Sequence, residues 1–169
     1  VHAHLQKARM LVSLQQLDEG RKEYQTALTL EPETPKTLNE RSLVGIQRVQ
    51  AYRGLADICR QQQKHEEGVG YLVKAKAIDL ASSKTFSVPP STDLLAELAS
   101  MYALAGKNAE AIREYDDLAL YPGREISALQ EMARLCDLVN DVDRARNAYR
   151  RAALRSKDPV AQLLQGGPL

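Results

Sequence analysis

The side chains best suited to nucleophilic or metal chemistry are two cysteines and three histidines. A cysteine thiolate can attack a substrate or bind a metal, and histidines complete many zinc sites. Zinc ligands on one helical face lie three or four residues apart. His2 and His4 are two residues apart and point to different faces, and His65 has no second histidine near it. We therefore expect no metal site and no cofactor.

Glycines that could cradle a phosphate do not stand at the required spacing. A phosphate-binding loop needs a glycine five residues before its Gly-Lys pair, and Met101 occupies that position before the pair that begins at Gly106. Gly68 and Gly70 could open a dinucleotide fingerprint, but Val73 replaces its third glycine. Serine, histidine and aspartate are too scattered to indicate a catalytic triad. The sequence predicts a protein that is not an enzyme.

Composition predicts a helical protein with balanced charge. The chain has 169 residues, of which 44% are hydrophobic, enough to build a core. Only 5% are aromatic, which favours helices packed through alanine and leucine over a β-sheet. Lys and Arg number 23 against 22 Asp and Glu. This balance argues against nucleic acid or a membrane surface as the partner.

The sequence also lacks the features that direct a chain to a membrane or out of the cell. No apolar run approaches the roughly 18 to 20 residues of a membrane span, and the N-terminus lacks the layout of a signal peptide. Two cysteines are too few for a disulfide framework. We expect an intracellular protein, cytoplasmic or nuclear, without membrane insertion. Val1 in place of Met indicates a fragment of a longer chain.

The elements that would position any site follow a repeat of 34 residues. One stretch carries Leu95, Leu98, Ala99, Tyr102, Ala111 and Tyr115, and the next carries Leu129, Met132, Ala133, Cys136, Ala145 and Tyr149. The same template fits the N-terminus through Ala8, Leu11, Gly20, Tyr24, Ala27 and Pro32. Small residues let two helices cross closely, and large residues fill the space beside them. The pattern resembles the tetratricopeptide repeat (TPR) family.

The resemblance implies an all-α fold, a right-handed α-solenoid of about four TPR-like helix-turn-helix repeats, one of them with an elongated first helix. The repeat domain is expected over residues 1–158, with units at about 1–34, 35–82, 92–125 and 126–159. Residues 159–169 are expected to form a flexible tail or a partial capping helix. Cys59 and Cys136 take the same large position in two units. Both should therefore be buried in the core.

Two insertions stretch the second unit. The first, Pro35–Arg48, opens with Thr37-x-x-Glu40, the spacing of a capping box. It predicts one long helix from about Leu38 to Gln63, and the prolines at 32 and 35 should end the helix before it.

The second insertion, Ser82–Ser91, contains a serine pair and a proline pair and predicts an irregular loop. We expect this loop to be the most mobile internal segment. Within the long helix, Gly45 and Gly54 each cost about 1 kcal/mol relative to alanine.

In TPR proteins the first helices of successive repeats line a concave groove through side chains at about positions 2, 5, 9, 12 and 13 of each unit. The resemblance therefore assigns partner binding to Arg9, Arg53, Asp57, Arg60, Gln61, Ser100, Leu104, Gln130, Arg134 and Leu138. The forked donors of the arginines suit carboxylates, and the leucines offer apolar contacts. The expected partner is a protein or peptide that carries acidic residues.

One subgroup of the family binds the C-terminal peptide of heat-shock chaperones through Lys and Asn at positions 5 and 9. Leu5 and Arg9 stand there, and Asp57 replaces a further Asn, so this peptide is disfavoured. Two functions remain open. The chain is either a scaffold that binds a peptide or helical segment of a partner in its groove, or a structural segment of a longer solenoid in a multiprotein complex. In the second case its edges and insertions would make the contacts.

Overall fold

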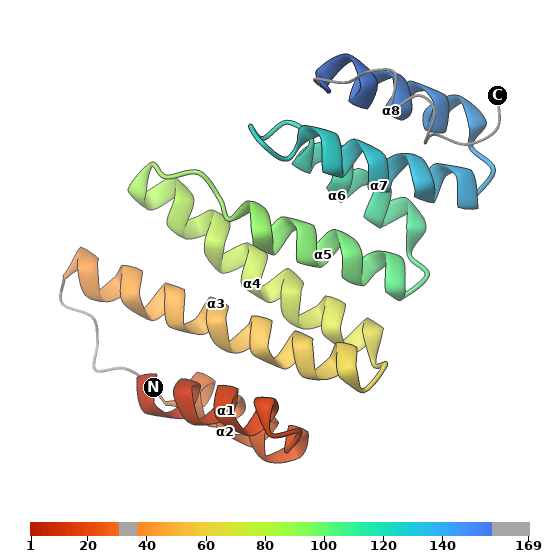
Figure 1. Ribbon diagram of the computed structural model, residues 1–169. Coiled ribbons are helices and arrows are strands. Elements are labelled where there is room, and N and C mark those ends of the chain that lie inside the picture. Colours follow the sequence, from red (N-terminus) through yellow and green to blue (C-terminus); the bar gives the residue numbers. More distant parts are fainter. Residues whose placement is uncertain (31–36, 157–169) are drawn as a thin grey trace. The chain divides into compact units, whose positions relative to one another are not determined.

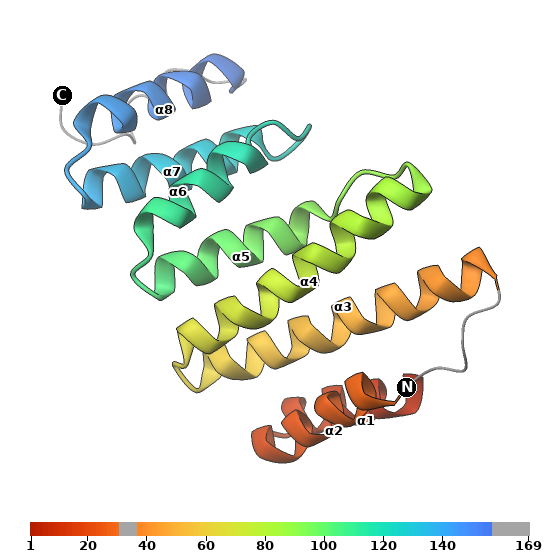
Figure 2. The same cartoon turned by 180° about the vertical axis from the view of Figure 1, so that it is seen from behind.

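All regular structure in the described part of the chain is helical. The computed structural model describes residues 1–30 and 37–156, and these form eight helices (Figures 1 and 2). The helices are α1 (His2–Ser13), α2 (Leu17–Thr29), α3 (Leu38–Gln61), α4 (His65–Phe86), α5 (Thr92–Leu104), α6 (Asn108–Leu118), α7 (Glu125–Leu138) and α8 (Val142–Arg155). The predicted all-α fold is confirmed. The predicted helix stops at Pro32 and Pro35, and the predicted tail, lie outside the described residues.

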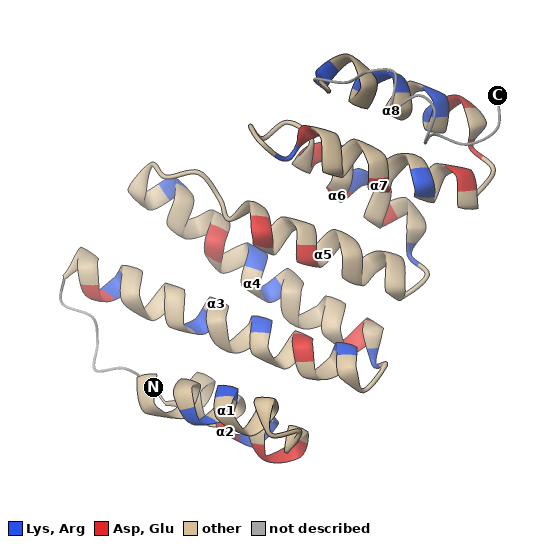
Figure 3. Cartoon of the chain, viewed as in Figure 1, with Lys and Arg blue, Asp and Glu red and all other residues tan. Residues whose placement is uncertain are grey.

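The chain divides into two compact units, whose boundary falls in the first turn of α5. Unit 1 comprises Val1–Leu94 and unit 2 comprises Leu95–Leu169. In unit 1, α1 packs on α2, α3 packs on α4, and α3 also contacts α1 and α2. In unit 2, α7 packs on α6 and α8. Acidic and basic residues are interspersed on α3, whereas α8 is mainly basic (Figure 3). Across the described ranges, no helix is long and apolar enough to cross a membrane.

Each unit has its own hydrophobic core, with alanines where the helices come close together. One hydrophobic cluster of unit 1 contains Leu5, Ala8, Tyr24, Ala27, Ala51, Leu55 and Ile58. In unit 2, α5 contributes Leu95 and Ala99 to a core that α6, α7 and α8 complete. Small side chains allow the close approach that a helical hairpin requires.

Both cysteines lie in the core, as predicted. Cys59 and Cys136 are free thiols and are fully buried. Burial raises the pKa of both thiols, and at Cys59 it does so against the opposing effect of Arg21. Because the thiolate is the reactive form, these side chains are suited to packing rather than to nucleophilic chemistry.

The turns inside the four helical pairs share one backbone geometry. Each contains a residue in the left-handed region, with φ between 58° and 74°, and these residues are Gln15, Gln63, Gly106 and Asn140. In every case the next residue donates its N–H to the carbonyl five residues earlier, at 2.8 to 2.9 Å. This bond closes a Schellman-type turn, in which glycine is the usual left-handed residue.

Replacing Gln63 by glycine should therefore stabilise the protein by up to about 1 kcal/mol, because a side chain is strained at φ 58°. The converse change, Gly106→Ala, should destabilise it by about 1 kcal/mol, since Gly106 has φ +74° and nothing within 4 Å of an added Cβ. Urea unfolding followed by circular dichroism measures both changes. A neutral Gly106→Ala would contradict the strain argument.

The first insertion extends α3, as predicted. The Thr37 hydroxyl accepts a hydrogen bond from the N–H of Glu40 at 3.2 Å, and the Glu40 carboxylate accepts one from the N–H of Thr37 at 3.3 Å. This reciprocal pair is a capping box. The helix ends at Gln61, two residues before the predicted end.

The prediction of an irregular loop over the whole of Ser82–Ser91 is wrong. Helix α4 continues to Phe86, so only the last residues of that segment are irregular. The added turns lie against the added turns of α3: a Cβ on Gly45 would be 3.2 Å from Ser82 Oγ and 3.7 Å from Ile78 Cγ2. Packing on α3 thus overrides the low helix propensity of the serines. The two insertions form one elongated hairpin.

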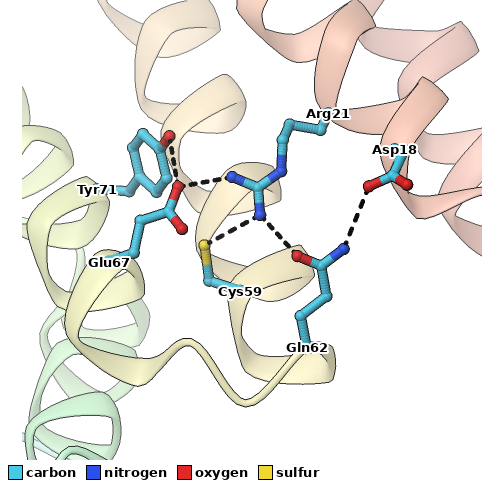
Figure 4. A network of polar contacts seen from close by, with 6 residues as sticks. All are labelled: Asp18, Arg21, Cys59, Gln62, Glu67 and Tyr71. Carbon is cyan, nitrogen blue, oxygen red and sulfur yellow. Dashed lines mark hydrogen bonds and ion pairs between the residues drawn. The ribbon is translucent and has the colours of Figure 1, made fainter.

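A polar network connects α2 to the base of this hairpin (Figure 4). Arg21 donates to Glu67 Oε1 at 2.6 Å and to Gln62 Oε1 at 2.9 Å. The amide of Gln62 donates in turn to Asp18 at 3.4 Å, and the Tyr71 hydroxyl donates to Glu67 Oε1 at 3.1 Å. The Arg21 side chain is only 16% exposed. Its hydrogen bonds therefore stabilise the packing of α2 against the second helical pair.

This network predicts a pH-dependent stability. Burial alone would raise the pKa of Glu67, but Arg21 and Tyr71 hold it below its ordinary value. A lowered folded-state pKa contributes stability that is present above the ordinary glutamate pKa and is lost as the pH falls through the folded-state value. Glu67→Gln should therefore flatten the fall of the urea midpoint between neutral and acid pH.

Glu19→Gln is the matched control, because exposed Glu19 occupies the same place in the first turn of α2 that Glu67 has in α4. The urea midpoint of Glu19→Gln should depend on pH in the same way as that of the wild type. Profiles that coincide for Glu67→Gln and the wild type would show that the Arg21 network contributes nothing to acid sensitivity.

Candidate partner-binding groove

In unit 1, two residues predicted for the groove meet around one buried tyrosine. Arg9 comes from α1 and Asp57 from α3, two helices that contact each other. Tyr24 of α2 is 4% exposed, and its ring lies against Gly54, where an added Cβ would be 2.2 Å from Tyr24 Cζ. The missing side chain at Gly54 therefore lets the ring reach the α3 face that carries Asp57.

The electrostatics at Tyr24 show that both charges act on its hydroxyl. Burial raises the pKa of Tyr24, the carboxylate of Asp57 raises it further, and the guanidinium of Arg9 opposes them. The hydroxyl therefore remains protonated at neutral pH. An arginine, a phenol and a carboxylate from α1, α2 and α3 thus form one electrostatically interacting group, the Tyr24 cluster.

Asp57 also organises the end of α3. Its Oδ2 accepts a hydrogen bond from Gln61 Nε2 at 3.0 Å, and its Oδ1 lies 3.8 Å from Arg60 Nη1. The Arg60 side chain is 40% exposed, and Arg53 is half-buried one helical turn before Asp57. Four of the five groove residues predicted in unit 1 therefore lie on α3, and two of them, Arg60 and Gln61, contact the Asp57 carboxylate.

In unit 2, the residues predicted for a second surface differ in character from those of unit 1. Leu104 at the end of α5 is 48% exposed and Leu138 at the end of α7 is 70% exposed. Arg134 lies 3.3 Å from Glu131 in the preceding turn of α7, whereas Ser100 and Gln130 are half-buried. This surface combines apolar contact area with an exposed guanidinium.

The sequence-based assignment did not include Leu5 among the partner-binding residues, and it made one omission. Leu5 occupies a groove position in the template, but it is 1% exposed and packs in the core of unit 1. An apolar side chain at that position is buried rather than left in water. Tyr24 was assigned to packing alone, and the influence of Arg9 and Asp57 on its hydroxyl was missed. The equivalent Tyr115 of unit 2 is likewise influenced by a groove arginine, Arg134.

Among the described residues, no group of three or more His, Cys, Asp and Glu side chains is placed to hold a metal ion. His4 instead pairs with Glu23 at 2.6 Å, and the same carboxylate lies 2.6 Å from Lys7 Nζ. The arrangement on both surfaces is suited to non-covalent recognition through hydrogen bonds, ion pairs and apolar contact.

Comparison with known proteins identifies the repeat. The family model described as Tetratricopeptide repeat matches residues 1–34, the span of the first predicted unit, so the resemblance to this family is confirmed. The crystal structure of a thermophilic TPR protein in Thermus thermophilus is similar at 15% sequence identity, with a TM-score of 0.46 over 97% of this chain and 95% of that chain. No curated protein sequence matches the chain.

Proposed function

We propose that this tetratricopeptide repeat protein is an interaction scaffold that receives a peptide or helical segment of a partner protein on the faces of its first helices. The observation that supports this most is the cluster in unit 1, where Arg9 and Asp57 both influence the hydroxyl of buried Tyr24. Such a cluster offers a fixed pattern of charge, and fixed patterns give an interface its specificity.

The arginines on these faces are available to a partner at low cost. Arg60 and Arg134 are 40% and 72% exposed, and their ion pairs with neighbours on the same helix measure 3.8 and 3.3 Å. Exposed pairs of this kind contribute about 0 to 1 kcal/mol. A carboxylate of the partner can replace them and gain the bidentate geometry that the guanidinium favours. This supports a partner with acidic residues.

The apolar part of the proposed interface is tested by site-specific photocrosslinking. A photoreactive amino acid replaces Leu104 or Leu138 on the groove faces, and Leu120 or Leu154 serves as a matched control because both are 75% exposed elsewhere. We expect a specific adduct from the first two positions in a native extract, and mass spectrometry of the adduct identifies the partner segment. Adducts from the control leucines alone would refute the groove proposal.

An alternative function follows from the elongated hairpin. Its α3 arm exposes Leu38, Leu43 and Ile46, which are 61%, 55% and 52% accessible. Leu43 and Ile46 are three residues apart and share a helical face. If the chain is a structural segment of a larger complex, the photoreactive group at Leu43 should give the adduct and the groove positions should not.

A further inference from the structure

A cleft of about 410 Å³ lies in unit 2 among α6, α7 and α8. Ile112 of α6 and Met132 of α7 contribute its apolar lining, and both are almost completely buried. Arg113, Arg144 and Arg151 contribute guanidinium groups to the same cleft. None of the ten residues predicted for the groove lines it. The cleft is therefore a second candidate surface, distinct from the proposed groove.

The charge of this region is unusual in a chain that is otherwise balanced. Helix α8 carries five arginines and one acidic residue, and its basic character is visible along its length (Figure 3). Arg144 and Arg151 are seven residues apart, two helical turns, so they lie on one face with Asn147 between them. This spacing aims three polar side chains of α8 into one hollow.

The donors in the cleft are only partly satisfied within the described residues. Arg144 lies 3.5 Å from Asp141 and is 69% exposed, and Arg113 makes one long contact of 3.4 Å to the carbonyl of Ala109. Arg151 is better paired, at 2.8 Å from Asp116. Arg113 and Arg144 can therefore donate to a ligand without breaking a buried interaction.

We propose that this cleft binds an acidic segment of a protein partner, with a Glu or Asp carboxylate on Arg113 and Arg144 and an adjacent apolar side chain on Ile112 and Met132. A carboxylate fits better than a phosphate, because Asp143 also lines the cleft and a phosphate of nearly two negative charges is repelled more strongly by it. No aromatic residue lines the cleft for stacking on nucleic acid bases.

The probe is a fluorescently labelled synthetic peptide of alternating Glu and Leu, with two matched peptides in which Gln or phosphoserine replaces Glu. Fluorescence anisotropy with the whole chain measures binding. We expect the Glu peptide to bind and the Gln peptide to bind at least about tenfold more weakly. Equal binding of the Gln peptide, stronger binding of the phosphoserine peptide, or no binding of the Glu peptide would each overturn the proposal.

Substitutions locate the binding on the chain. Arg113→Glu and Arg144→Glu should each lower the affinity for the Glu peptide at least about tenfold. Arg146 and Arg150 are exposed on α8 but lie outside the cleft. Arg146→Glu and Arg150→Glu should therefore change that affinity by less than about twofold. Circular dichroism confirms that each variant is folded. Equal losses from both pairs would indicate nonspecific attraction to α8 and overturn the proposal.

Three further variants separate this cleft from the groove and test for a gain of binding. Arg9→Glu and Arg134→Glu test the groove: a loss of Glu-peptide binding in these two variants, with no loss from Arg113→Glu and Arg144→Glu, would place the peptide in the groove and overturn the proposal. Asp116→Asn releases Arg151 from its 2.8 Å pair and should tighten binding by about threefold. Weaker binding of the Glu peptide by Asp116→Asn would contradict the assignment of Arg151 to the cleft.

Discussion

Replacing Gly54 by alanine is expected to destabilise the protein by about 1 to 3 kcal/mol, the cost of overpacking a well-filled core. The added Cβ would lie 2.2 Å from Tyr24 Cζ and 2.5 and 2.6 Å from its two Cε atoms. Three ring atoms cannot all move away, because Tyr24 is itself buried in the core of unit 1. In an uncrowded helix the same substitution stabilises by up to about 1 kcal/mol.

Gly70→Ala provides the matched control. Gly70 is also inside a helix, α4, but nothing lies within 4 Å of its added Cβ. Gly70→Ala should therefore stabilise the protein, whereas Gly54→Ala destabilises it. Urea unfolding of the two variants should show midpoint shifts of opposite sign. Introducing Gly54→Ala into a Tyr24→Leu background should cost much less, because the ring is gone. An unchanged cost in that background would exclude the ring contact as the cause.

The second large effect is expected from proline at Ser83. In the interior of α4, proline removes one backbone hydrogen bond and clashes with the carbonyl four residues earlier, at a cost of about 3 kcal/mol. The loop predicted from sequence would accept proline with little change. Ser83→Pro therefore distinguishes the helical end of the hairpin from an irregular segment more sharply than any side-chain change.

Ser83→Ala is the control for this substitution, since it removes the hydroxyl and keeps the backbone N–H. Alanine should be neutral or slightly stabilising because it is the better helix former. Circular dichroism should show a loss of helix and a lower urea midpoint for the proline variant alone. If the two variants have the same midpoint, residues 82–86 do not form a stable helix in solution.

The repeat spacing was sufficient to predict the helical pairs and the core residues. The template predicts a close helix crossing at alanine in the eighth position of a unit and a space-filling side chain at tyrosine in the twenty-fourth. In the structure, Ala8 and Tyr24 are both buried. The start of α3 was also predictable, because its capping box depends on residues only three apart. Local signals were therefore enough to place this helix start.

Features that depend on contacts distant in sequence were not predictable. The serine pair at 82 indicates a loop locally, and only the neighbouring α3 shows why α4 continues past it. From the sequence, Gly54 shows only the helix-propensity cost of a glycine. Its role in making room for a ring was not predictable, because that ring comes from Tyr24 of α2, thirty residues earlier.

The candidate sites also combine features that the sequence predicts with features that only the structure shows. The register of the repeat placed Arg9 and Asp57 at equivalent positions, so a shared face could be predicted, but their common influence on Tyr24 was visible only in the structure. The cleft of unit 2 combines residues of α6, α7 and α8 that are up to about forty positions apart. No spacing rule for a single helix identifies such a set.

The paired lengthening of α3 and α4 makes this hairpin a spacer of adjustable reach. At 1.5 Å per residue, the 24 residues of α3 span about 36 Å, against about 18 Å for the 12 residues of α1. Removing or adding seven residues in both arms changes the length by about two turns while nearly preserving which side chains face inward. The distance between the hairpin tip and the Tyr24 cluster can thus vary without altering the cluster.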